Sequence, residues 1–166
     1  MAQAITDTGP ILHLHEIGSL AVFRQFASGL AVPDRVAVEL QARGLSMADI
    51  SAAGVAAIRL EPYSVDPAFQ REASGLQAAD LEVAAIACDF SFSRLVLTDD
   101  LALRRWLERR GNVVVGSVGL LLRACHLGIL DRHELEVGMD RLLSSSLHLT
   151  SALRAYVRAR VRDLGD

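Results

Sequence analysis

The sequence contains no lysine, and all 17 of its basic residues are arginine. Receiver domains and phosphatases of the haloacid dehalogenase type normally place a lysine beside the phosphoryl group, so this absence argues against both classes. Any cationic contact to a phosphate must come from a guanidinium group, which can bind it through a bidentate fork. The formal net charge is −3, which predicts only weak non-specific attraction to nucleic acid.

Long apolar runs and cysteines are also scarce. No run approaches the ~20 apolar residues that a transmembrane helix needs, and no basic region precedes an apolar segment at the N-terminus, so we expect neither a membrane span nor a secretory signal. The two cysteines, Cys88 and Cys125, form no C-x-x-C motif and are interpreted as reduced core residues. Together these features predict a cytoplasmic protein.

The 166 residues, 51% of them hydrophobic and 22% charged, are typical of one globular domain with a real core. Short β-type runs alternate with helical patterns, which predicts a parallel sheet covered by helices on both faces. The expected strands are residues 4–6, 30–32, 57–60, 94–98 and 113–115. Asp34 is a candidate helix N-cap, Gly44 a candidate helix stop, and residues 61–74 the best loop candidate. After Gly128 the pattern is purely helical, with helices expected at residues 132–143 and 151–161.

Four segments each set an acidic side chain among apolar residues. They are residues 5–10, 36–40, 79–87 and 95–100. Burying a lone carboxylate is costly unless something compensates its charge. Acids that recur beside hydrophobic runs therefore suggest a shared pocket, and a divalent cation is the natural compensator. This pattern favours metal-dependent phosphodiester chemistry.

The expected elements bring these acids towards one place. Asp7 directly follows the first strand, and Asp99 and Asp100 follow the strand at residues 94–98, so these acids should lie at the same edge of the sheet. Glu39 shares the inward stripe of its helix with apolar residues. Asp80 lies in the first turn of the central helix, where the helix dipole favours an anion. Two strand ends and two helices can thus supply one cleft.

Each of these residues also has a plainer interpretation. Asp7 can be a turn acid, Asp99 or Asp100 a helix cap and Glu39 a partly exposed helical residue, while Glu82 competes with Asp80 for the inward position. The triplet at residues 7–9 also reads as the Asp-Thr-Gly of aspartic proteases, but that fold is β-rich and this chain is helix-rich. The joint placement of the acids outweighs the single interpretations.

Two histidines, His13 and His15, alternate with leucines on an expected helix and point in different directions. We interpret them as surface or packing residues.

Taken together, the four segments resemble a PIN domain. Asp7, Glu39 and Asp80 match, in order and context, the family's acids at the end of the first strand, on an early helix and on a central helix. Residues 98–100 resemble the family's Thr-x-Asp, which places the fourth acid at Asp100. Residues 113–121, followed by residues 128–130, are similar to a prokaryotic subfamily with a Gly-Thr-x-Gly-x-Leu element. Ser117 stands there in place of the threonine, and Asp80 stands where that subfamily often has glutamate.

The resemblance implies a three-layer α/β/α fold with a central parallel sheet of four to five short strands and a helical C-terminal extension. It implies a nuclease domain over residues 1–145, with a C-terminal helix in residues 146–166 packed on or extending it. It further implies a Mg²⁺- or Mn²⁺-dependent ribonuclease, the toxin half of a VapBC-type toxin–antitoxin pair, which binds RNA and a cognate antitoxin and forms a homodimer. Carboxylates suit such hard, oxygen-seeking ions.

The implied site comprises several groups of residues. The catalytic and metal-binding acids would be Asp7, Glu39, Asp80 and Asp100, with Asp99 and Glu82 as further candidate ligands. The supporting hydroxyl groups would be those of Thr8, Thr98 and Ser117. Arg104 and Arg105 lie one turn beyond Asp100 and are candidates for contact with RNA phosphates, against the plainer interpretation of a solvated helix face.

Two alternatives stay open beside the toxin. One is an RNA-processing or structure-specific nuclease of the same fold that acts without an antitoxin. The other is a non-catalytic scaffold module, which predicts eroded acidic positions, whereas all four positions are filled in this sequence.

Overall fold

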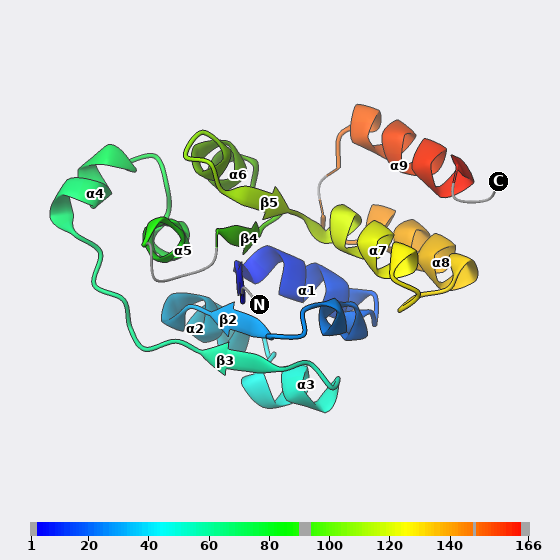
Figure 1. Cartoon of the computed structure of the whole chain (residues 1–166), viewed down its shortest axis with the longest axis horizontal. Coiled ribbons are helices and arrows are strands. Elements are labelled where there is room, and N and C mark those ends of the chain that lie inside the picture. Colours follow the sequence, from blue (N-terminus) through cyan, green and yellow to red (C-terminus); the bar gives the residue numbers. More distant parts are fainter. Residues whose placement is uncertain (1–2, 90–93, 148, 164–166) are drawn as a thin grey trace.

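The computed structural model describes residues 3–89, 94–147 and 149–163, built around one five-stranded sheet flanked by helices (Figure 1). Every strand pairing is parallel, and the strand order is β3-β2-β1-β4-β5. The strands are β1 (Ala4–Thr6), β2 (Leu30–Val32), β3 (Ala57–Arg59), β4 (Leu95–Leu97) and β5 (Val113–Val115). The five strands expected from the sequence and their parallel arrangement are confirmed.

Helices connect and flank these strands. They are α1 (Thr8–Glu16), the 3-10 helix η1 (Leu20–Gln25), α2 (Asp34–Ala42), α3 (Met47–Ala52), α4 (Pro67–Glu72), α5 (Ala78–Cys88), α6 (Leu101–Glu108), α7 (Ser117–His126), α8 (Arg132–Leu143) and α9 (Ser151–Asp163). Gly44 follows α2 with a φ of +81°, as expected of a glycine that ends a helix. No helix in the described part of the chain is long and apolar enough to cross a membrane.

Two local predictions were wrong. The segment expected to be a loop contains α4, because Asp66 caps this helix through the backbone N–H groups of Ala68 and Phe69, and Pro67 is preorganised for its first turn. Asp34 is not an N-cap: Pro33 holds that position, and the Asp34 carboxylate instead pairs with the Arg59 guanidinium at 2.6 Å.

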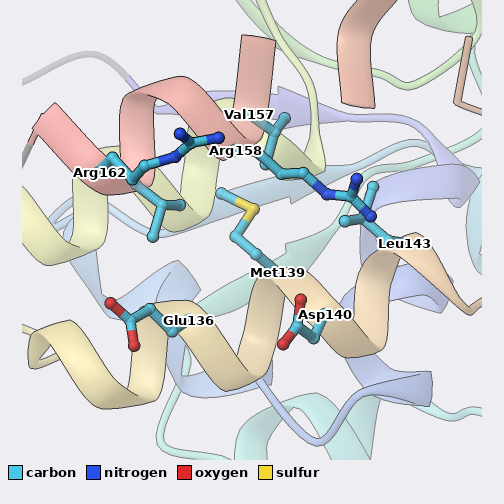
Figure 2. A pocket seen from close by; sticks show the side chains of 8 residues that line it. Glu136, Met139, Asp140, Leu143, Val157, Arg158 and Arg162 are labelled. Atoms are coloured by element: carbon cyan, nitrogen blue, oxygen red, sulfur yellow. The ribbon is translucent and has the colours of Figure 1, made fainter. Parts of the chain in front are cut away.

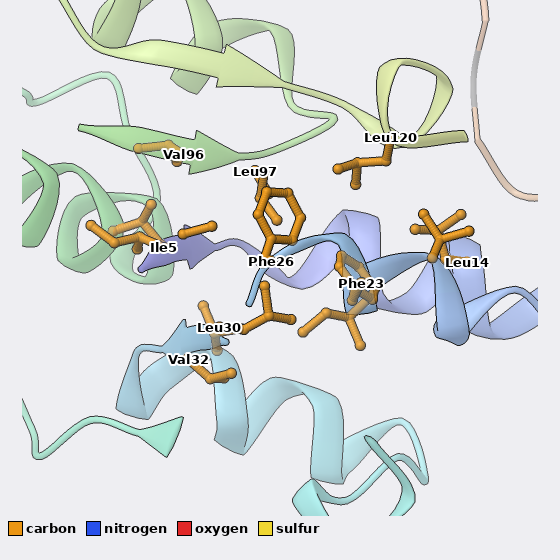
Figure 3. Close-up of a cluster of buried hydrophobic side chains, with 14 of the residues drawn as sticks. Ile5, Leu14, Phe23, Phe26, Leu30, Val32, Val96, Leu97 and Leu120 are labelled. Carbon is orange, nitrogen blue, oxygen red and sulfur yellow. The ribbon is translucent and has the colours of Figure 1, made fainter. Parts of the chain in front are cut away.

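The core lies on both sides of the central strands. All residues of β1 and β2 are buried, whereas the edge strands β3 and β5 are partly exposed. Figure 3 shows side chains of the strands, such as Ile5, Leu30 and Val96, gathered with Leu14 and Phe23 from α1 and η1. Burial of each such side chain contributes about 1.5–3 kcal/mol. Packing therefore fixes the position of β1, and with it the position of Asp7, which follows its last residue.

The register of β1 and β4 determines where the acids lie. Ile5 is paired with Val96 and Thr6 with Leu97, and the Asp7 N–H donates to the Leu97 carbonyl at 2.8 Å. Asp7 and Thr98 consequently leave the sheet side by side at the same edge.

The last helix lies against α8. Val157 is the residue of α9 that is almost fully buried, at 1% exposure. A cavity of about 270 Å³ lies between the two helices, with Glu136 and Asp140 of α8 on one side and Arg158 and Arg162 of α9 on the other (Figure 2).

Candidate active site

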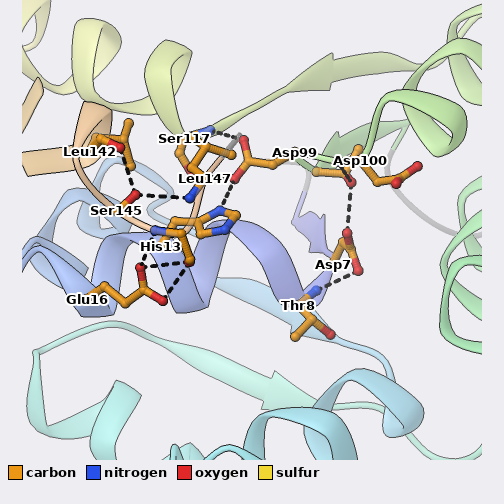
Figure 4. Close-up of polar contacts among 12 residues, drawn as sticks. Asp7, Thr8, His13, Glu16, Asp99, Asp100, Ser117, Leu142, Ser145 and Leu147 are labelled. Carbon is orange, nitrogen blue, oxygen red and sulfur yellow. Dashed lines mark hydrogen bonds and ion pairs between the residues drawn. The ribbon is translucent and has the colours of Figure 1, made fainter. Parts of the chain in front are cut away.

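Asp7 is held at the carboxyl end of β1 by two hydrogen bonds. Its Oδ1 accepts the Thr8 N–H at 2.6 Å, and its Oδ2 accepts the Thr98 hydroxyl at 2.8 Å (Figure 4). The Thr98 hydroxyl oxygen in turn accepts the Asp100 N–H at 3.0 Å. Thr98 is fully buried and Asp7 is 7% exposed. This chain of hydrogen bonds fixes Asp7 relative to the turn that carries Asp100.

A second threonine connects the site to α2. The Thr8 hydroxyl donates to Glu39 Oε2 at 2.7 Å, across 31 residues of sequence. The expectation that Glu39 lies on the inward stripe of its helix was wrong, because Glu39 is exposed on α2. Only the hydrogen bond from Thr8 holds its carboxylate towards Asp7.

Asp100 and Asp80 come from the starts of two helices. Asp100 is the N-cap of α6, where its Oδ1 accepts the Leu103 N–H at 2.7 Å. Asp80 lies half-buried in the first turn of α5. Burial and the negative charges of Asp7, Asp100 and Glu39 together raise the pKa of Asp80 to about 6, although a hydrogen bond from the Gln77 backbone lowers it. The charges of the other three acids therefore all act on Asp80 through space.

The same repulsion acts on Asp7. Burial is the main cause that raises the pKa of this carboxyl, and the charges of Glu39 and Asp100 add to it, while the hydrogen bonds from Thr98 and Thr8 lower it. An edge with several mutually repelling carboxylates attracts a divalent cation, because the cation removes the repulsion.

The donor set fits a partly hydrated hard ion. Four carboxylates offer the oxygen ligands that Mg²⁺ and Mn²⁺ prefer. Within residues 3–89, 94–147 and 149–163, no three His, Cys, Asp or Glu side chains are already gathered closely enough to hold an ion. Mg²⁺ commonly uses one or two carboxylates and keeps several waters, so it does not require a closed cage.

Asp99, one of the further candidate ligands, points away from these acids. Figure 4 shows its carboxylate and that of Asp100 on opposite sides of the turn. Asp99 accepts the Ser117 N–H at 2.7 Å, the Ser117 hydroxyl at 2.5 Å and a bond from His13 Nδ1 at 2.8 Å. Ser117, expected as a supporting residue, thus contacts Asp99. The sequence interpretation of His13 missed this contact, because nothing in local spacing relates residues 86 positions apart.

Glu82, the other further candidate, is 1% exposed. Its Oε2 accepts the Arg35 N–H at 2.8 Å and its Oε1 accepts the Tyr63 N–H at 3.1 Å. The carboxylate therefore joins the start of α2 to the segment that follows β3. Beside it lies a cavity of about 390 Å³, which is also lined by Glu39 of the proposed site.

The two candidate RNA contacts differ in their surroundings. The Arg104 guanidinium donates to the Thr98 carbonyl at 3.2 Å and the Val114 carbonyl at 3.1 Å, and it pairs with Glu108. Arg104 therefore links α6 to the ends of β4 and β5. Arg105, the next residue, is exposed on α6.

The parallel sheet flanked by helices defines an α/β protein, with Asp7 and Asp100 beyond the ends of two central strands. A family model described as "DUF3368: PIN domain" matches residues 3–163. The chain belongs to this PIN-domain family, and the membership indicates a nuclease-type function that involves binding of nucleic acid. No curated protein and no solved structure matched the chain.

Proposed function

We propose that this PIN domain is a Mg²⁺- or Mn²⁺-dependent endoribonuclease that hydrolyses phosphodiester bonds in RNA. The observation that carries the proposal is the chain of hydrogen bonds that joins Asp7 to Glu39 through Thr8 and to the turn of Asp100 through Thr98. Burial and the charges of Asp7, Asp100 and Glu39 also raise the pKa of Asp80 beside them, to about 6. The pKa values of two neighbouring carboxyl groups, Asp7 and Asp80, are raised, and such perturbed groups cluster at functional sites. Asp7, Glu39, Asp80 and Asp100 are the residues that would hold the ion.

The bound ion would supply an activated water and a positive charge beside the reacting phosphate. The residues of the chain prepare the place for it. Thr98 and Thr8 orient the Asp7 carboxylate, and Thr8 also turns Glu39 towards Asp7. Each carboxylate oxygen has two lone pairs, so these hydrogen bonds leave acceptor capacity for an ion or its waters. No side-chain nucleophile is needed.

The test uses purified protein and a fluorescently labelled RNA with a DNA of the same sequence beside it. We expect cleavage of the RNA with Mg²⁺ or Mn²⁺, its loss in EDTA, and its loss in Asp7→Asn with an unchanged circular dichroism spectrum. Asp140→Asn is the matched control, because Asp140 is an exposed acid on α8. Full activity of Asp7→Asn would refute the mechanism, and cleavage of the DNA alone would refute the substrate.

We also propose that the chain is the toxin of a type II toxin–antitoxin system, on the strength of its resemblance to that branch of the family. An antitoxin segment would enter the same acidic cleft and pair an Arg or Lys with the carboxylates in place of metal. Expression of the chain alone should slow growth, and co-expression of the adjacent gene should restore it. Normal growth with confirmed expression and confirmed RNA cleavage would favour the RNA-processing alternative.

The remaining expectations concern assembly and location. We propose a cytoplasmic homodimer, with helices near Asp7 and after residue 45 as candidate surfaces. Large apolar side chains such as Val38 on α2 and Ile58 on β3 are more than half exposed, and burial of such side chains favours association. Light scattering at micromolar concentration should give the mass of a dimer, and a monomer mass would contradict the expectation.

A further inference from the structure

The turn between β4 and α6 carries two adjacent aspartates with different surroundings. Asp100 lies with the acids of the proposed site, whereas Asp99 faces the start of α7 and one side of α1 (Figure 4). Its side chain is 9% exposed and that of His13 is 16% exposed. Asp99 therefore makes its contacts in the interior, at the junction of α1, α7 and the turn.

Two residues of the described part of the chain, Ser117 and His13, supply donors to Asp99. Ser117 contributes its N–H to Oδ1 and its hydroxyl to Oδ2, and His13 contributes Nδ1 to Oδ2. Hydrogen bonds to a charged acceptor are shorter and stronger than those between neutral groups. The Asp99 carboxylate also lies at the N-terminus of α7, where the helix dipole favours an anion. These contacts hold the turn from two helices at once.

The close approach depends on a glycine. A Cβ on residue 116 would lie 2.7 Å from Asp99 Oδ1 and 3.0 Å from an Arg104 nitrogen, so any other residue would push the carboxylate away from Ser117. These contacts give a physical reason for the glycine and the serine at residues 116 and 117, which belong to the element that resembles the subfamily. The glycine leaves room for the carboxylate, and the serine supplies two of its donors.

We propose that Asp99 is a positioning residue, which His13 and Ser117 hold in place so that the turn presents Thr98 and Asp100 to Asp7. This inference rests on the proposed function and assigns Asp99 no direct contact with metal. Thr98 and Asp100 flank Asp99 directly, and both belong to the hydrogen-bond chain that ends on Asp7. A shift of the Asp99 backbone therefore moves two members of the site.

The experiment compares Mn²⁺ binding, measured by calorimetry, in Asp99→Asn, Ser117→Ala, Ser117→Thr and His13→Phe. His15→Phe is the matched control, because His15 is an exposed histidine two positions along the same helix. Loss of outer partners commonly lowers metal affinity by about 10- to 100-fold. We expect losses in that range for the first, second and fourth variants, although none of the replaced residues would touch the ion. Ser117→Thr should keep the affinity, since threonine preserves the N–H and the hydroxyl.

A double variant separates this role from direct ligation. Because Asp99 and Ser117 act as one unit, Asp99→Asn with Ser117→Ala should bind Mn²⁺ about as well as Asp99→Asn alone. Near-normal binding in Ser117→Ala and His13→Phe, with loss only in Asp99→Asn, would identify Asp99 as a ligand and overturn the inference.

Two further outcomes would also overturn it. Normal Mn²⁺ binding in all variants would show that the junction does not position the site, and loss of the folded circular dichroism spectrum would show a purely structural role. Absence of Mn²⁺ binding in the wild-type protein would instead overturn the proposed function, and this inference would fall with it.

Discussion

Asp80 makes the pH dependence of metal binding a direct test of the acidic site. Burial, reinforced by the charges of Asp7, Asp100 and Glu39, raises its pKa from 3.8 to about 6. At that pKa about nine-tenths of the carboxyl groups are ionised at pH 7 and only about one-tenth at pH 5. If Mn²⁺ binds the ionised form, its apparent affinity should fall about tenfold between these pH values. A carboxyl group with the ordinary pKa would stay ionised over the same range.

The raised pKa of Asp80 also predicts the pH dependence of stability in the metal-free protein. Metal affinity should rise with pH, whereas the contribution of Asp80 to stability should fall. Because the pKa of Asp80 is higher in the folded state, the folded protein binds more protons than the unfolded chain between about pH 4 and pH 6. The contribution of Asp80 to stability therefore decreases as pH rises through this window. In EDTA, Asp80→Asn should melt at a higher temperature than the wild type at pH 7 and at nearly the same temperature at pH 4. Saturating Mn²⁺ should reverse the order at pH 7, because only the wild type binds the ion well.

The assays are calorimetric titration with Mn²⁺ at pH 5, 6 and 7 and thermal melts of both proteins with and without EDTA. The control is again Asp140→Asn, which should follow the wild type throughout. An unchanged tenfold pH dependence in Asp80→Asn, or a lower melting temperature of that variant at pH 7 in EDTA, would refute the reasoning.

The remaining predictions follow from how other charged residues are bonded. Glu82→Gln should lower the free energy of unfolding by about 1–3 kcal/mol, because the buried carboxylate accepts two backbone N–H groups. It should also lose less nuclease activity than Asp80→Asn. The reverse ranking in the same assay would place Glu82, and not Asp80, in the active site. Arg104→Gln should lower the melting temperature, since its guanidinium bonds two backbone carbonyls, and an unchanged melt would contradict this. Arg105→Gln should leave stability unchanged and reduce the slope of log affinity for labelled RNA against log salt by about 1, as expected for one lost phosphate contact; an unchanged slope in fluorescence anisotropy would remove Arg105 from the interface.

The parts of the fold that could be predicted from sequence depend on local pattern. Strands β1, β2 and β4 are short apolar runs that end at turn residues, and α5 is apolar nearly all round because it is buried on most sides. Since the carboxyl ends of parallel strands lie at one edge, the placement of Asp7 and Asp100 at the same edge could be predicted from strand assignment. The pairing of β1 with β4, which brings Asp7 beside Thr98, depends on the strand order and could not be predicted from the strand pattern.

The parts that could not be predicted depend on contacts between distant segments. Asp99 and Asp100 are both plausible helix caps, and only the path of the turn decides that Asp100 caps α6 while Asp99 faces α7. Glu82 and Asp80 lie two residues apart on one helix, but they have different surroundings. Glu82 accepts the Tyr63 N–H from a distant segment, whereas Asp80 lies near the acids of the proposed site. Asp34 fits an N-cap by residue type, but the neighbouring Arg59 on β3 provides a charged partner.

The contrast among the buried acids supports a functional reason for the site. Two acids outside the proposed site are held by several donors: Asp99 receives three hydrogen bonds and Glu82 two. Within the site, Asp7 also receives two. Asp80, two residues from Glu82, faces the like charges of Asp7, Asp100 and Glu39 instead. Such repulsion destabilises the metal-free fold, and replacement of one acid by a neutral residue would relieve it. We infer that the repulsion around Asp80 is kept because of the cation binding proposed above, since that binding would remove it.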